Sequence, residues 1–331
     1  MDEGTEQTDR PDPARAVAVH PRVVVGVDGS PGSRAALAWA MAAAARRGAA
    51  LDVVSAFPVD FYWIDPYLVN ELRVESLRSD TEARTRELVD TVRRDPAVAS
   101  LPGTSSVAVE VVVVAGGAAE HLVRIADDAG LLVVGSRGRG AVRSAVLGSV
   151  ALHCSTQARC PVVVVRPAPE TTSPSRVVVG VDGSAASRLA VVRAAEAAEE
   201  VGAELEAVAA FAAPNYWSDL YVVLTESIAE LRNAARRRAE TEVTQVLGEE
   251  PRVRVSVVTV EGPAGDALVQ QAAGAALLVV GSRSRSRLPG MVLGSAALHC
   301  VVHAACPVMV VHPQSDAEQA RKAPAMAEAG Y

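Results

Sequence analysis

The sequence predicts an α/β protein with two tandem, doubly wound, open sheets of five parallel strands each. The stretch RVVVGVDGS at 22–30 returns unchanged at 176–184, and LLVVGSRGRG at 131–140 returns as LLVVGSRSRS at 277–286. A period near 150 residues is too long for a solenoid repeat, so the chain is a tandem of whole domains. Within each copy, apolar β-branched runs alternate with helical segments, which is typical of a parallel sheet covered on both faces.

In the first copy, the elements follow one another from a strand at 22–27 that ends in the turn signal Asp-Gly-Ser. The Ala-rich helix at 33–47 stops at Gly48, a typical helix-ending glycine. Further strands are predicted at 51–57, 107–114, 131–134 and 161–165, and further helices at about 68–94, 118–129 and 149–157. The Pro/Gly/Ser-containing stretch 95–106 is interpreted as a loop.

The second copy repeats this order. Its strands are predicted near 176–181, 205–211, 252–260, 277–280 and 307–311. The predicted domains are therefore 21–166 and 176–313, joined by a Pro- and Ser/Thr-rich linker at 167–175. Residues 1–20 and 314–331 are polar, so we expect a disordered leader and a disordered tail there.

Composition excludes several classes of function. A net charge of −7 argues against binding of nucleic acid, which depends on clustered cations. No stretch approaches the roughly 20 apolar residues needed to span a bilayer, and the acidic N-terminus lacks the apolar core of a signal peptide. A cytoplasmic protein without nucleic-acid or membrane partners is expected.

Four cysteines lie at matched places in the two copies, in pairs six residues apart: Cys154, Cys160, Cys300 and Cys306. This spacing fits neither a CxxC zinc site nor one face of a helix, which favours buried, reduced thiols. The neighbouring His153 and His299 leave metal binding open.

The loop after the fourth strand carries the strongest functional signal, the spacing G-x2-G-x9-G-S formed by Gly135, Gly138, Gly148 and Ser149. Glycines allow backbone amides to approach an anion, and a helix that begins at Gly148–Ser149 offers its positive dipole end to a phosphate. Arg137 and Arg139 add positive charge. The alternative is a flexible loop whose Gly-Ser pair only caps the helix.

Asp28 and Asp182 end the first strand of each copy. A carboxylate there can accept a hydrogen bond from a ribose hydroxyl or approach a metal held by phosphates. Alternatively, it bonds the amides of its own turn. Because the carboxyl ends of parallel strands meet at one edge of a sheet, both repeated motifs are expected to face one crevice per half. No P-loop lysine, nucleophile elbow or HExxH motif is present, so no catalytic residue is assigned.

Together, VGVDGS, the glycine spacing and the closing CPVVVV strand resemble the universal stress protein family in its tandem, ATP-binding form. The resemblance covers both halves and implies ATP, accompanied by Mg²⁺, on open sheets of strand order 3-2-1-4-5. It also implies that the fifth strands, at 161–165 and 307–311, pair across the two halves. A further homodimer is left open, and no protein partner is identified.

By position, the resemblance implies that Gly26 and Asp28 face the ribose and adenine, and that the backbone near Ala56 contacts adenine. The phosphates would be held by Gly135, Arg137, Gly138, Arg139, Gly148 and Ser149. The matching residues of the second half are Gly180, Asp182, Gly281, Arg283, Ser284, Gly294 and Ser295.

One departure separates the halves, because Ser284 stands where the first half has Gly138. If that position needs a left-handed backbone, a side chain costs about 1–2 kcal/mol, and a Cβ would also crowd the phosphates. We therefore expect the second half to bind ATP more weakly than the first.

The resemblance implies regulation of stress or dormancy responses through nucleotide-dependent conformation or partner binding. Slow ATP hydrolysis or self-phosphorylation stays open. The alternatives are an ATP-dependent adenylyl- or phosphotransferase on the same scaffold, or a scaffold protein that binds no nucleotide.

Overall fold

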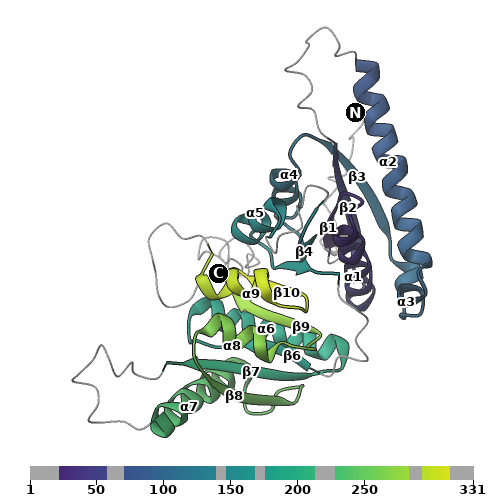
Figure 1. Cartoon of the computed structure of the whole chain (residues 1–331). Helices are drawn as coiled ribbons and strands as arrows, with labels where there is room; N and C mark the ends of the chain where they lie inside the picture. Colours follow the sequence, from purple (N-terminus) through teal and green to yellow (C-terminus); the bar gives the residue numbers. More distant parts are fainter. Residues whose placement is uncertain are drawn as a thin grey trace, which may run out of the picture.

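The computed structural model of the chain describes residues 22–57, 71–138, 147–167, 176–212, 228–282 and 293–313 (Figure 1). The strands of the first half are β1 (Arg22–Val27), β2 (Ala50–Phe57), β3 (Val109–Ala115), β4 (Leu131–Gly135) and β5 (Val162–Val165). Those of the second half are β6 (Arg176–Gly180), β7 (Glu204–Phe211), β8 (Val255–Glu261), β9 (Leu277–Gly281) and β10 (Val308–Val311). These ten strands lie at or near the predicted positions.

The helices alternate with the strands, as expected for crossover connections in a parallel sheet. In the first half they are α1 (Pro31–Arg47), α2 (Glu71–Arg94), α4 (Ala118–Ile125) and α5 (Ser149–Gln157). In the second half they are α6 (Ala185–Val201), α7 (Ile228–Leu247), α8 (Ala264–Gln271) and α9 (Ser295–His303).

All strands belong to one ten-stranded sheet of order β3-β2-β1-β4-β5-β10-β9-β6-β7-β8. Each half is parallel and has the predicted order 3-2-1-4-5. The halves join because β5 and β10 pair antiparallel, with Val163 opposite Met309. The predicted pairing of the fifth strands is confirmed, and it leaves neither of these strands as an open edge.

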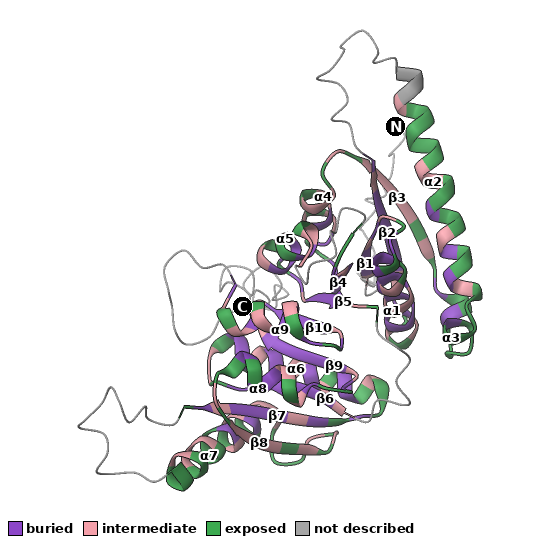
Figure 2. Cartoon of the chain, viewed as in Figure 1, coloured by how far each residue is buried: buried purple, intermediate pink, exposed green. Residues whose placement is uncertain are grey.

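Helices cover both faces of the sheet, and Figure 2 shows buried residues along its central strands and exposed ones on the outside of α2 and α7. One core lies under α1, α2, α6 and α7 and the other under α4, α5, α8 and α9. Both consist almost entirely of Val, Ala and Leu, so burial of many small apolar side chains stabilises the fold. Cys154, Cys160, Cys300 and Cys306 are buried and free, as predicted.

Short-range signals fix the start and end of the first helix in each half. The Ser30 hydroxyl accepts a hydrogen bond from the amide of Ser33 at 3.2 Å, and Gly48 ends α1 in a left-handed conformation at φ 57°. Gly29, at φ 81°, makes the turn between β1 and α1. The second half repeats this arrangement, with Ser184 capping α6. The strand-end aspartates are thereby placed just before a helix start.

The interpretation of 95–106 as a loop is wrong. This segment forms the short helix α3 (Pro96–Ala99) and the 3-10 turn η3 (Thr104–Ser106). The Asp95 carboxylate accepts from the amide of Ala97 at 3.0 Å, and Pro96 occupies the first turn, where its missing N–H costs nothing. The predicted helix at 118–129 is also shorter and ends at Ile125.

The predicted leader and tail, and the linker apart from Pro167, lie outside the described residues. None of the helices described is long and apolar enough to cross a membrane.

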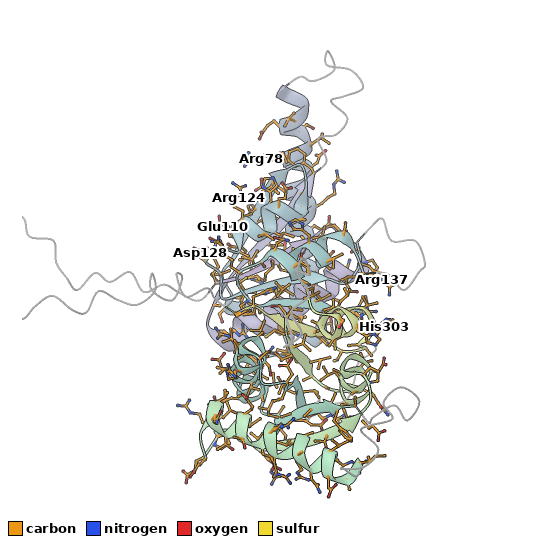
Figure 3. The ribbon with its side chains drawn as sticks, turned by 90° about the vertical axis from the view of Figure 1, so that its left-hand side faces the viewer. Arg78, Glu110, Arg124, Asp128, Arg137 and His303 are labelled. Atoms are coloured by element: carbon orange, nitrogen blue, oxygen red, sulfur yellow. The ribbon has the colours of Figure 1, made fainter. Side chains whose placement is uncertain are left out.

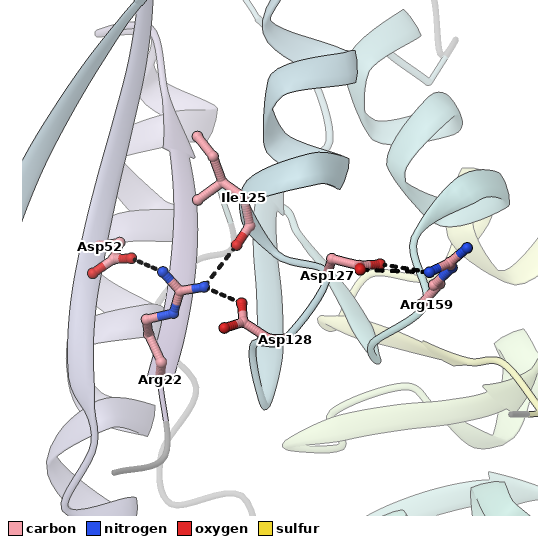
Figure 4. A network of polar contacts seen from close by, with 6 residues as sticks. All are labelled: Arg22, Asp52, Ile125, Asp127, Asp128 and Arg159. Atoms are coloured by element: carbon pink, nitrogen blue, oxygen red, sulfur yellow. Dashed lines mark hydrogen bonds and ion pairs between the residues drawn. The ribbon is translucent and has the colours of Figure 1, made fainter. Parts of the chain in front are cut away.

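An ion-pair network connects the start of β1 to β2 and to the end of α4 (Figure 4). Arg22 donates to Asp52 at 2.7 Å, to the Ile125 carbonyl at 2.8 Å and to Asp128. Burial raises the pKa of Asp52, and the adjacent Arg22 counteracts part of that rise. The network lies at the amino end of β1, so it supports the sheet at the edge opposite Asp28.

Candidate functional site

In the second half, a crevice of about 750 Å³ opens at the carboxyl edge of the sheet. Its walls include the ends of β6 and β9 and the starts of α6 and α9, where the strand order reverses. This is the usual ligand position in open α/β sheets. Four of the residues named from the sequence line it, namely Gly180, Asp182, Gly281 and Gly294. The two repeated motifs therefore meet at one crevice.

Both strand-end aspartates bond the amides of their own turn, as the turn interpretation predicts. Oδ1 of Asp28 accepts from the Ser30 amide, and Oδ1 of Asp182 from the Ser184 amide, each at 2.9 Å. Each hydrogen bond uses one carboxylate oxygen. The other oxygen of Asp28 faces the glycine loop, because a Cβ built on Gly138 would lie 2.6 Å from Oδ2. Asp28 and the glycine loop are thus direct neighbours.

Gly138 is needed for space and not for backbone conformation. The φ of Gly138 lies outside the left-handed region. The cost of about 1–2 kcal/mol that a left-handed backbone would impose on a side chain therefore does not apply at this residue. A side chain at 138 would instead collide with Asp28. Arg139, Arg283 and Ser284 lie outside the described residues.

Close approach of backbones explains two other glycines of the site. A Cβ on Gly135 would lie 2.6 Å from the carbonyl carbon of Gly32, and one on Gly281 would lie 2.8 Å from that of Ala186. The end of the fourth strand therefore touches the first turn of the first helix in each half. Gly26 is different, since a Cβ there would lie 2.7 Å from Leu122 of α4. Its glycine is explained by helix packing. Ala56, on β2, is partly buried beside Val114 of β3.

The helix after the glycine loop begins in the same way in both halves. Gly148 precedes α5 and donates to the Ser136 carbonyl at 2.9 Å, and Gly294 precedes α9 and donates to Ser282 at 2.7 Å. Ser149 and Ser295 are exposed first residues, and neither helix start has a side-chain cap. Gly148 and Gly294 occupy the N-cap positions, and the serine hydroxyls make no cap hydrogen bond, so the alternative in which the Gly-Ser pair only caps the helix stays open. The first amides of a helix lack intrahelical partners, so both starts can bind an anion.

Positive charge gathers beside the first glycine loop. Arg137 is exposed, and the half-buried Arg166 lies close to it. Burial lowers the pKa of Arg166, and the neighbouring charge of Arg137 lowers it further. Figure 3 shows Arg137 and His303, near the junction of the halves, on the same side of the molecule. An anion is electrostatically favoured here.

Two parts of the crevice were not predicted from the sequence. The end of β7 contributes Ala210, which corresponds to Ala56 at the spacing of the repeat and could have been found from it. The helix α7 contributes Arg237, Arg238 and Glu242, which belong to no motif. Arg188 lies 3.5 Å from Glu242, so an ion pair joins α6 to α7 at this wall.

Metal ligands are sparse in the described parts of the chain, where no group of three His, Cys, Asp or Glu side chains is placed to hold an ion. His299 pairs with Asp266 at 2.9 Å. At the end of β6, the crevice offers one carboxylate, that of Asp182.

Comparison with known proteins places the chain beside one family. The sequence model of the "Universal stress protein family" matches residues 20–166 and 174–312. A universal stress protein of Mycobacterium tuberculosis is 35% identical over 303 residues, which cover 88% of this chain and 97% of the relative. A second one from that organism is 33% identical over 316 residues, with 89% and 96% covered. The crystal structure of a universal stress protein from Archaeoglobus fulgidus has the same fold, with a TM-score of 0.61 at 18% identity, covering 90% of this chain and 98% of that one.

Proposed function

Since the chain belongs to the universal stress protein family and carries two copies of its domain in tandem, we propose that it is an ATP-binding regulatory protein. Each half would hold one ATP between the end of its first strand and the helix that follows its glycine loop. Nucleotide occupancy would then change the conformation of the chain or its affinity for a partner.

The observation that carries the proposal is the crevice of the second half, where an aspartate, close-packed glycines and a helix start converge. Its volume of about 750 Å³ lies in the range of small-molecule sites. The positive helix end suits phosphates, the strand-end carboxylate suits hydroxyl groups, and the backbone near Ala210 borders space for a base.

Residue by residue, the first half offers the same chemistry. The amides at Gly148 and Ser149 would hold phosphates, aided by Arg137 and Gly138, and Asp28 would accept from the ribose. The backbone of Ala56 would border the adenine. Mg²⁺ bound with ATP would be held mainly by the phosphate oxygens, with a single strand-end carboxylate nearby.

Glutamates at the two helix starts test the proposal without disturbing the fold. Ser149→Glu and Ser295→Glu place a carboxylate at an exposed first helical residue, where the helix dipole favours it. The same charge repels phosphate. By titration calorimetry with ATP, we expect two sites in the wild type, one in each variant and none in the double variant.

The matched controls are Ser149→Gln and Ser295→Gln, which keep the length of the side chain and lack its charge. Each is expected to weaken ATP binding at its own site much less than the matched glutamate does. Full ATP stoichiometry in the folded double glutamate variant would show that the phosphates bind elsewhere.

A further inference from the structure

The helices that follow the two glycine loops have their far ends held by the opposite half. The last four carbonyls of a helix lack intrahelical partners and need other donors. Nε2 of His312, directly after β10, lies 3.0 Å from the Ser155 carbonyl in the last turns of α5. Arg166, directly after β5, donates to the Val301 carbonyl at 3.1 Å and to that of Val302, both near the end of α9.

These contacts form a symmetric pair. Arg166 and His312 occupy the same position in the two copies, 146 residues apart, and so do Ser155 and Val301. The exchange follows from the antiparallel pairing of β5 with β10, which sets the end of each fifth strand beside the other half's helix. Both donors are half-buried, which shields these hydrogen bonds from water in part.

The residue before each donor accepts a hydrogen bond from the glycine loop of its own half. The Ser136 amide donates to the Val165 carbonyl at 2.8 Å, and Arg166 is the next residue. In the second half, the Ser282 amide donates to Val311 at 2.7 Å, and His312 follows. The strand end of one half therefore connects its own glycine loop to the helix of the other half.

The helices are short enough to carry a displacement along their length. Each has nine residues, or about 13 Å at 1.5 Å per residue. Backbone hydrogen bonds link the successive turns of such a helix, so a change of position at Ser155 can reach the amides at Ser149, six residues earlier. Amides that bind an anion must be held in place beforehand, because reorganisation reduces affinity.

Building on the proposed function, we propose that Arg166 and His312 are positioning residues that act across the junction of the halves. His312, from the second half, sets the ATP affinity of the first crevice. Arg166, from the first half, sets that of the second crevice.

The test uses the single-site chains described above. In Ser295→Glu, which keeps the first site, His312→Ala is expected to weaken ATP binding about threefold to tenfold, the effect of one hydrogen bond. In Ser149→Glu, which keeps the second site, the same substitution is expected to change the Kd less than twofold. The mirror variant Arg166→Met is expected to weaken the second site. His312→Gln, whose amide can still donate, is expected to restore most of the first-site affinity.

The control removes another contact between the halves. Arg47 pairs with Glu200 at 2.8 Å, from α1 to α6, and touches neither loop helix. Arg47→Ala is expected to leave both affinities unchanged. The inference is overturned if His312→Ala leaves the ATP affinity of the first half unchanged. It is also overturned if the substitution weakens ATP binding in the second half by the same factor. If neither single-site parent binds ATP, the proposed function fails as well.

Discussion

Gly138 shows how a single residue can affect the proposed ATP site of the first half. An added Cβ would lie 2.6 Å from Oδ2 of Asp28, so one of the two must move. Turning the Asp28 side chain away from its preferred rotamer costs about 0.5–1.5 kcal/mol, and 1.4 kcal/mol corresponds to a tenfold change in affinity. We expect Gly138→Ala to weaken ATP binding in the first half roughly twofold to tenfold, measured in the Ser295→Glu chain.

Gly130→Ala is the matched control, because a Cβ there would be in ordinary contact, 3.6 Å from the Arg22 carbonyl oxygen. It is expected to leave ATP affinity unchanged. Equal affinity in Gly138→Ala and the wild type would contradict the role of Gly138. The prediction that Ser284 makes the second site weaker stays a prediction.

The cysteines give a second prediction at the residue scale. Burial raises the pKa of Cys154 and Cys300 to about 12 and that of Cys306 to about 11. At pH 8, the thiolate fraction of a group with pKa about 12 is on the order of 10⁻⁴. Iodoacetamide at pH 8 should therefore leave the native thiols unlabelled and modify all four after unfolding, as mass spectrometry can count. Rapid labelling of the native chain would contradict this account.

At the scale of elements, Arg22 connects β1 to β2 and to the end of α4. Arg22→Ala leaves the buried Asp52 without its cation, and we expect a loss of about 1–3 kcal/mol of unfolding free energy at pH 7. The pKa of Asp52 is already raised, so its charge destabilises the fold as pH rises past the carboxyl's ordinary value. Losing Arg22 raises that pKa further, so the destabilisation should be larger at pH 7 than at pH 4.

Urea denaturation at both pH values measures this difference. Arg159→Ala is the control, because Arg159 and Asp127 form an exposed pair (Figure 4). Exposed pairs contribute less than about 1 kcal/mol. A loss that is equal at both pH values would contradict the account.

The elements also show which features of the sequence predict local structure. Continuous apolar runs predicted the strands, and Gly48 predicted the end of α1. Both predictions succeed because these residues influence the conformation of residues next to them in the sequence. The α3 turn was missed because its only signal is the Asp95–Pro96 pair. The close approaches of Gly26 and Gly135 depend on how helices lie across the sheet, which spacing alone does not give.

At the scale of the whole molecule, the two halves form one continuous sheet. The resemblance predicted that the fifth strands pair. The crossed contacts of Arg166 and His312 could not be predicted, since they depend on the antiparallel register of β5 and β10. The α7 wall of the crevice was missed because only tertiary packing within the second half brings Arg237 and Arg238 there.

ATP in each half is proposed to bind between the end of the first strand and the start of the loop helix. A crystal structure of the wild-type chain grown with saturating ATP and Mg²⁺ tests it most directly. Phosphate density is expected over the amides at Gly148–Ser149 and Gly294–Ser295, with adenine near Ala56 and Ala210. Nucleotide density elsewhere, or empty crevices at saturating ATP, would contradict it.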